Sequence, residues 1–131
     1  MFSEEEYVTI RTVSSGKIYK RTDGILVLRQ LPEKDNVTVL ELKEQLEVFL
    51  EIQNGTLSPL LIVVERLKRL ENEEKMFLTS TVTKFANKAA MVANSPIPVF
   101  LVNILLFIYR PAIPVKIFTN EAEALKWLQQ N

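Results

Sequence analysis

The amino-acid sequence predicts an α/β domain with one mixed β-sheet and about four α-helices covering it. Residues 7–31 contain three strand-like segments separated by short turn signals, which indicates an antiparallel meander. The rest of the chain alternates strand-length apolar runs with segments of helical periodicity, which favours parallel strands joined by right-handed crossovers. A chain of 131 residues is the size of one domain, so we expect a single domain over residues 1–131.

The N-terminal segments have the features of a β-meander. Tyr7–Val13 alternates, with Val8, Ile10 and Thr12 on one side, and the two following strand-like segments are Lys17–Arg21 and Ile25–Leu31. Between the last two, Asp23-Gly24 predicts a two-residue type I′ turn, in which both residues have positive φ. Three antiparallel strands therefore open the predicted fold.

The first helix is predicted by signals at both of its ends. Thr38 is suited to the N-cap position, and Glu41 three residues later completes a capping box. Asn54-Gly55 supplies a stop signal. Between them, apolar residues recur at helical spacing on one face, at Leu42, Leu46 and Phe49.

The middle of the chain predicts a buried strand, a second helix and another strand. Leu60–Val64 is a continuous apolar run, which is typical of a central parallel strand covered on both faces. Asn72 is suited to cap a helix with Glu73 and Glu74 in its first turn, and its inner face is expected at Leu78, Val82 and Phe85. Lys88–Ala93 then indicates a strand with close helix packing on its alanines.

The most apolar part of the chain, residues 95–118, contains a predicted helix over Ile97–Tyr109. Ser95-Pro96 is a favourable helix start, and Pro111 ends it. At about 1.5 Å per residue this helix is about 20 Å long, against a hydrocarbon core of about 30 Å. We therefore expect no transmembrane segment.

This helix is apolar nearly all round, and Asn103 is its strongly polar interior residue. We therefore expect its outer face to be buried against another surface. The alternatives are the rest of the domain together with a second copy of the chain, a protein partner or apolar ligand, and a membrane surface. The candidate interaction or ligand surface consists of Phe100, Leu101, Ile104, Leu105, Ile108, Tyr109 and Arg110.

The chain ends with a predicted strand over Pro114–Thr119 and a predicted helix over Asn120–Gln130. Asn120 is suited to the N-cap, and Glu123 stands three positions later, as in a capping box. The packing face of this helix is expected at Ala124, Leu125 and Leu128.

Composition excludes several classes of function. Lys+Arg and Asp+Glu each number 16, so no net charge is available to hold nucleic acid. The sequence has no cysteine and no histidine, which removes thiolate and imidazole metal sites and the usual nucleophile–base pairs. We expect no enzymatic activity, no cofactor and no metal site. The acidic N-terminus lacks the features of a secretory signal, so the cytoplasm is the expected location.

Two segments carry a resemblance to a known family. "PVKIFTNEAEALKWL", residues 114–128, and "LLIVVERLKRLENEEKMFL", residues 60–78, resemble STAS-like domains of the bacterial SpoIIAA-like group. The resemblance implies a regulatory role like that of the anti-sigma-factor antagonists. These proteins switch partners by phosphorylation of a serine at the start of a helix. The equivalent switch loop here is Glu71, Asn72, Glu73 and Glu74, which contains no hydroxyl group. The phosphorylation switch therefore does not carry over.

Two functions remain from the sequence. The first is a non-enzymatic STAS-like interaction or regulatory module that uses its apolar helix to form a homodimer or to bind a protein partner. The alternative is a carrier of a small apolar or lipid-like ligand, associated with a membrane surface.

Overall fold

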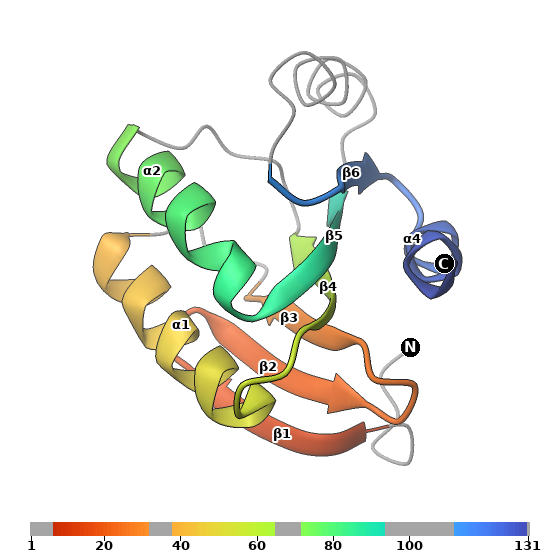
Figure 1. The fold of residues 1–131 in the computed structure, drawn as a ribbon, viewed down its shortest axis with the longest axis horizontal. Coiled ribbons are helices and arrows are strands. Elements are labelled where there is room, and N and C mark those ends of the chain that lie inside the picture. Colours follow the sequence, from red (N-terminus) through yellow and green to blue (C-terminus); the bar gives the residue numbers. More distant parts are fainter. Residues whose placement is uncertain (1–6, 32–37, 65–71, 94–111, 131) are drawn as a thin grey trace.

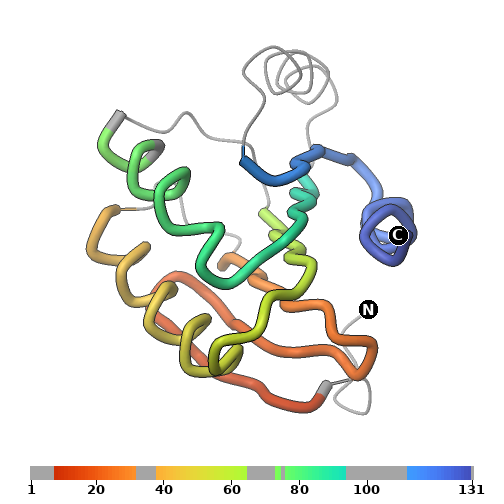
Figure 2. The backbone as a smooth tube through the Cα atoms, in the orientation of Figure 1, coloured from red at the N-terminus to blue at the C-terminus, as the bar shows by residue number. Residues whose placement is uncertain are grey.

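The computed structural model describes residues 7–31, 38–64, 72–93 and 112–130 (Figures 1 and 2). These residues form an α/β fold in which six strands make one mixed sheet, in the order β1-β2-β3-β4-β5-β6. The strands are β1 (Tyr7–Val13), β2 (Gly16–Arg21), β3 (Leu26–Gln30), β4 (Ser58–Val64), β5 (Ala86–Ala93) and β6 (Val115–Phe118). The helices are α1 (Val39–Gln53), α2 (Asn72–Thr81) and α4 (Glu121–Gln129), and a short 3₁₀ helix, η2 (Val82–Lys84), follows α2.

The predicted N-terminal meander is confirmed. β1, β2 and β3 pair antiparallel, and β3, β4, β5 and β6 pair parallel, so the sheet changes from antiparallel to parallel at β3. The tube in Figure 2 follows the chain from the hairpins of the meander into the parallel strands. Each strand therefore lies beside its neighbour in sequence.

The turn between β2 and β3 differs from the predicted type I′ turn. The Arg21 main-chain oxygen accepts from the Gly24 N–H at 3.0 Å, and the Arg21 N–H donates to the Ile25 oxygen at 2.9 Å. Among the described residues of this turn, only Gly24 has a positive φ, of 90°. The Asp23 carboxylate accepts from the Ile25 N–H two residues on, so Asp23 serves the turn through its side chain. A three-residue loop with one left-handed glycine therefore replaces the two-residue turn.

The predicted ends of the first helix are confirmed. At the N-terminus of α1, the Thr38 and Glu41 side chains each accept from the other residue's main-chain N–H, which is a complete capping box. At the C-terminus, Asn54 has φ 47° and donates to the Leu50 oxygen, and Gly55 follows with φ 88°. The left-handed pair ends the helix and turns the chain toward β4.

The sheet is covered on both faces. α1 and α2 lie on one side, where Ile18, Leu26, Leu60, Phe49 and Phe85 belong to one buried cluster, and the two phenylalanine rings stack at 4.5 Å. α4 lies on the opposite side, over a second cluster formed by Tyr19, Val27, Leu61, Ala90, Ala124 and Leu128. Neighbouring Leu60 and Leu61 point into different clusters, which confirms β4 as a central strand buried on both faces.

The second helix ends at Thr81, before Val82 and Phe85, which were predicted to lie on its inner face. α2 begins at Asn72 with Glu73 and Glu74 in its first turn, but the chain tightens into η2 at Val82, and buried Phe85 follows η2. β5 starts two residues before its predicted position, at Ala86.

The predicted helix over Ile97–Tyr109 lies outside the described residues. The described part of the chain contains three α-helices, and none of them is long and apolar enough to cross a membrane.

Candidate functional site

The surface predicted from the apolar segment, which is Phe100, Leu101, Ile104, Leu105, Ile108, Tyr109 and Arg110, lies outside the described residues and stays a prediction. The same holds for Glu71 of the switch-loop equivalent. The rest of that loop forms the first turn of α2, where Glu73 is exposed and Glu74 is half-buried. Acids in a first turn complement the positive end of the helix, so these two side chains have a structural role there.

A polar cluster joins the carboxyl end of β3 to the start of α4. The Arg29 guanidinium donates to the Tyr19 hydroxyl at 3.1 and 3.2 Å and to Glu121 Oε1 at 3.0 Å. Burial by itself lowers the pKa of Arg29, but the contacts with Tyr19 and Glu121 outweigh it and raise that pKa. Arg29 is therefore a fixed cation that holds β2, β3 and α4 together.

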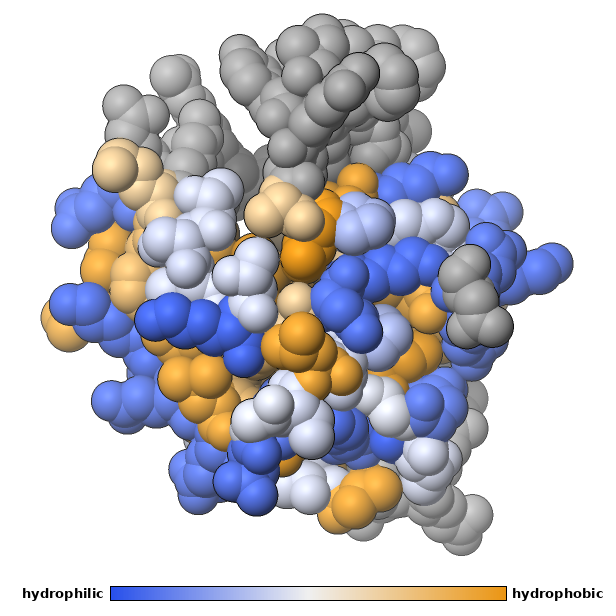
Figure 3. Space-filling model, in the orientation of Figure 1, coloured by the Kyte–Doolittle hydropathy of each residue, from blue (hydrophilic) through white to orange (hydrophobic). Residues whose placement is uncertain are grey.

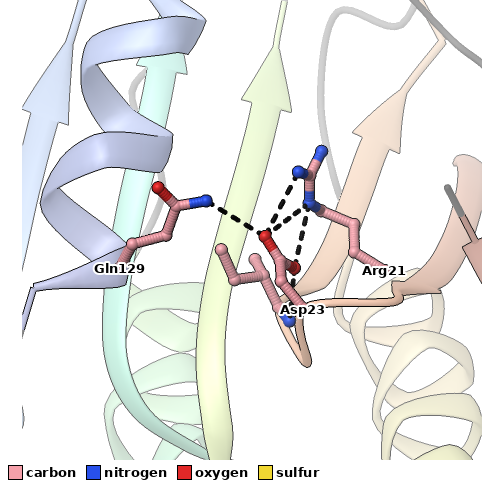
Figure 4. Close-up of polar contacts among 4 residues, drawn as sticks. Arg21, Asp23 and Gln129 are labelled. Atoms are coloured by element: carbon pink, nitrogen blue, oxygen red, sulfur yellow. Dashed lines mark hydrogen bonds and ion pairs between the residues drawn. The ribbon is translucent and has the colours of Figure 1, made fainter.

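A second cluster anchors the other end of α4 (Figure 4). The Asp23 carboxylate accepts from Arg21 Nε at 3.1 Å, from Gln129 Nε2 at 3.1 Å and from the Ile25 N–H at 3.2 Å. Burial favours a higher pKa for Asp23, but these hydrogen bonds and the charge of Arg21 lower it. Asp23 therefore stays ionised and ties the β2–β3 turn to the last turn of α4.

A third cluster lies on the opposite face, at the end of α1. Lys20 Nζ donates to Gln53 Oε1 and to Ser58 Oγ, and Gln53 Nε2 donates to the Phe85 main-chain oxygen at 2.7 Å. Gln53 is 2% exposed. Burial lowers the pKa of Lys20. The cluster connects β2, α1, the start of β4 and Phe85, the residue before β5. Within the described residues, no group of three or more Asp or Glu side chains is arranged to hold a metal ion.

The edge strand β1 presents apolar side chains to solvent. In the described part of the chain β1 pairs with β2 alone, so its other edge has no neighbouring strand. Val8 is 70% exposed and Ile10 is 39% exposed. Ile10 and exposed Thr12 alternate along the face of β1 that points away from α1, and Val8 lies where the β1–β2 register shifts between Tyr7 and Thr9.

On the other face, the flank of α1 beside β1 is acidic. Glu44, Glu47 and Glu51 follow one another at helical spacing on the exposed side of α1. Glu51 forms an ion pair with Arg11 of β1 at 3.1 Å. Glu44 accepts from the Ser14 hydroxyl and main-chain N–H at 2.6 and 3.0 Å, and these bonds lower the pKa of Glu44.

We call these two groups of side chains the β1 edge surface, which consists of Val8, Ile10, Arg11, Thr12, Glu44, Glu47 and Glu51. Figure 3 shows hydrophilic residues along the α1 flank and an apolar area at the lower margin of the molecule, where β1 runs. Sequence reasoning found the alternation of β1 but missed this surface. The available signals were the apolar side chains of a first, terminal strand and the acidic stripe on the following helix.

The fold is an α/β domain with an N-terminal antiparallel meander. In the described residues, the outer strand of this meander, β1, has one edge that is not paired with another strand. A family model described as "Domain of unknown function (DUF7793)" matches residues 19–131. The chain therefore belongs to this family. The match begins at Tyr19 in β2, so β1 precedes the matched region.

Comparison with solved structures finds a protein of unknown function from Arthrobacter sp. FB24. It is 24% identical to this chain, covers 87% of this chain and 99% of its own, and has a TM-score of 0.31. Comparison with curated proteins gives no match.

Proposed function

We propose that this domain is a non-enzymatic, STAS-like interaction module that binds a protein surface, either of a partner or of a second copy of the chain. The order of elements supports the proposal, since a meander is followed by β-α units and a C-terminal helix with the Ala-Leu-x-Trp-Leu pattern. In that helix Ala124 and Leu128 are buried against the sheet, and the Trp127 ring lies 5.7 Å from Phe118. A fourth helix over residues 97–109, in the connection from β5 to β6, belongs to the same proposal.

The β1 edge surface is the observation that carries the proposal. An edge strand offers main-chain N–H and C=O groups to a further strand, and proteins use such edges for β-strand addition. Here the edge is accompanied by exposed Val8 and Ile10, whose burial would add apolar contact area. Arg21, Arg29 and Asp23, by contrast, are engaged in contacts that hold the fold together.

The apolar segment predicted over Ile97–Tyr109 supplies a further contact in this proposal, through Phe100, Leu101, Leu105 and their neighbours. The same segment favours the second candidate function, a carrier of a small apolar or lipid-like ligand at a membrane surface. Both candidates are proposed for the cytoplasm.

Native mass spectrometry and light scattering on the full chain separate the two functions. The interaction module is expected as a dimer, or as a defined complex with a protein partner, without a bound small molecule. A monomer that retains a mass in the lipid range would contradict the interaction module and support the carrier.

A further inference from the structure

We infer that Asn54, at the C-terminal end of α1, is a site of spontaneous modification, where the side-chain amide is lost as ammonia through a cyclic imide formed with Gly55. Asn54 is the one asparagine of the sequence that is followed by glycine. Asparagine is among the thermolabile residues of proteins, and a glycine has no Cβ atom to hinder the approach of its own main-chain nitrogen. The pair that ends α1 is therefore also suited to this reaction.

The reaction uses atoms of these two residues and one molecule of water. The Gly55 main-chain nitrogen attacks the Asn54 Cγ atom, and the side-chain amide leaves as ammonia with the proton that the Gly55 nitrogen gives up. Water then opens the imide, adding its hydroxyl group to a carbonyl carbon and its remaining proton to the nitrogen. Cleavage at Cγ gives aspartate, whereas cleavage at the main-chain carbonyl gives isoaspartate, in which the chain continues through the side chain.

Both reacting groups are open to solvent. Asn54 and Gly55 are exposed, and a Cβ atom added at Gly55 would have no other atom within 4 Å. In the described part of the chain, neither the Asn54 side-chain amide nor the Gly55 N–H takes part in a hydrogen bond. Nothing in the fold therefore withdraws the amide carbon or the attacking nitrogen.

The Asp23-Gly24 pair could close the same ring, but its reacting groups are engaged. The Gly24 N–H donates to the Arg21 main-chain oxygen at 3.0 Å. The Asp23 carboxylate accepts hydrogen bonds from two side chains and from a main-chain N–H. The fold therefore protects this pair and leaves Asn54-Gly55 open.

The main-chain conformation of Asn54 sets how the reaction begins. Asn54 has φ 47° and ψ 49°, and among the described residues it is the non-glycine residue with a positive φ. The Gly55 nitrogen reaches Cγ only after ψ of Asn54 rotates away from this value. Such a rotation breaks the hydrogen bonds that Thr56 donates across the turn to the Gln53 oxygen. Helix ends open locally at little cost in free energy, so the reaction proceeds from a brief opening of the end of α1.

The product weakens the end of α1. A carboxylate replaces a neutral amide at the negative end of the helix dipole, where the last turn has no basic residue and already contains Glu51. Isoaspartate also lengthens the main chain between the helix and Gly55. The preceding residue, Gln53, bonds to Lys20 and to the Phe85 oxygen, so the change reaches the cluster that joins α1 to the sheet.

The test is incubation of the purified full chain at mildly alkaline pH, below its melting temperature, followed by peptide mapping with mass spectrometry. Asn54 is expected to lose its amide before any other asparagine and to give both aspartate and isoaspartate. Gly55→Ala is expected to slow this loss at least about fivefold, because its Cβ atom hinders the attacking nitrogen. Gly24→Ala is the matched control, since Gly24 also has a positive φ and open space around it, and this variant should lose the Asn54 amide at the unaltered rate.

Two results would overturn the site. One is loss of the amide from another asparagine before Asn54, and the other is an unchanged rate in Gly55→Ala. The effect on α1 is measured separately with Asn54→Asp, which should unfold at a lower urea concentration than the unaltered protein at neutral pH. An equal unfolding midpoint would overturn the weakening of α1.

Discussion

Lys88 Nζ in β5 lies 2.6 Å from the main-chain oxygen of Trp127 in the last turn of α4. The same ammonium group is 3.1 Å from the Gln130 oxygen and 4.3 Å from the centre of the Trp127 ring. The last carbonyl groups of a helix have no partner inside the helix, and they carry the negative end of its dipole. One lysine from the sheet therefore satisfies the end of α4 and holds its indole ring.

Replacing Lys88 with methionine should lower the free energy of unfolding by about 1–2 kcal/mol, because it removes both the cap and the cation–π contact while keeping side-chain bulk. Lys43→Met on the exposed face of α1 is the control and should change stability by less than about 0.5 kcal/mol. Urea unfolding monitored by Trp127 fluorescence measures the stability change of each variant. Equal effects from the two substitutions would contradict the capping role of Lys88.

The lowered pKa of Asp23 makes part of the stability depend on pH. A carboxyl group whose pKa is lower in the folded than in the unfolded state contributes stability that is fully present above the unfolded value of about 3.9. That contribution is lost as the pH falls through the lowered folded pKa. The unaltered protein should therefore be more stable than Asp23→Asn at neutral pH, and the difference should shrink as the pH falls below about 4. Chemical unfolding of both proteins across this pH range measures the difference in their free energies of unfolding. A difference that does not change with pH would rule out the ionised Asp23 carboxylate as its source.

Gly16 is required by the close approach of β2 to β3. A Cβ atom at Gly16 would overlap the Arg29 main-chain oxygen and lie 2.9 Å from the Gln30 Cα. Gly16→Ala should therefore cost about 2–3 kcal/mol of stability, because the paired strands must move apart. Gly55→Ala is a useful comparison, since Gly55 has φ 88° but open space around its Cα, and its strain should cost about 1 kcal/mol. Denaturant unfolding of the two variants measures both losses of stability. A larger loss for Gly55→Ala than for Gly16→Ala would contradict the steric argument.

Features encoded by neighbouring residues were predictable from the sequence. The capping box of Thr38 and Glu41 and the left-handed end at Asn54-Gly55 each depend on residues close together in the chain, and both are confirmed. The continuous apolar run at Leu60–Val64 likewise predicted its central position, because a strand covered on both faces has no polar side.

Features that depend on distant contacts were not predictable. The Asp23-Gly24 pair suggested a type I′ turn, but the turn is a three-residue loop in which the Asp23 carboxylate also accepts a hydrogen bond from Gln129, 106 residues away in sequence. The open edge of β1 follows from the order of the strands in the sheet. The apolar contact surface predicted around Leu101 and Leu105 stays a prediction, since it lies outside the described residues.

The Arg29–Glu121 pair is an ion pair between residues 92 apart in sequence, and it links β3 to the start of α4. Both side chains are about one-third exposed, so the pair should be stronger than a fully exposed ion pair and weaker than a buried one. In a double-mutant cycle of Arg29→Met and Glu121→Gln, we expect a coupling energy of about 1 kcal/mol. Arg29→Met should cost more than Glu121→Gln, because it also removes the two hydrogen bonds to the Tyr19 hydroxyl. Urea unfolding of the two single variants and the double variant measures the cycle. A coupling energy near zero would mean that α4 is held at its start by apolar packing alone.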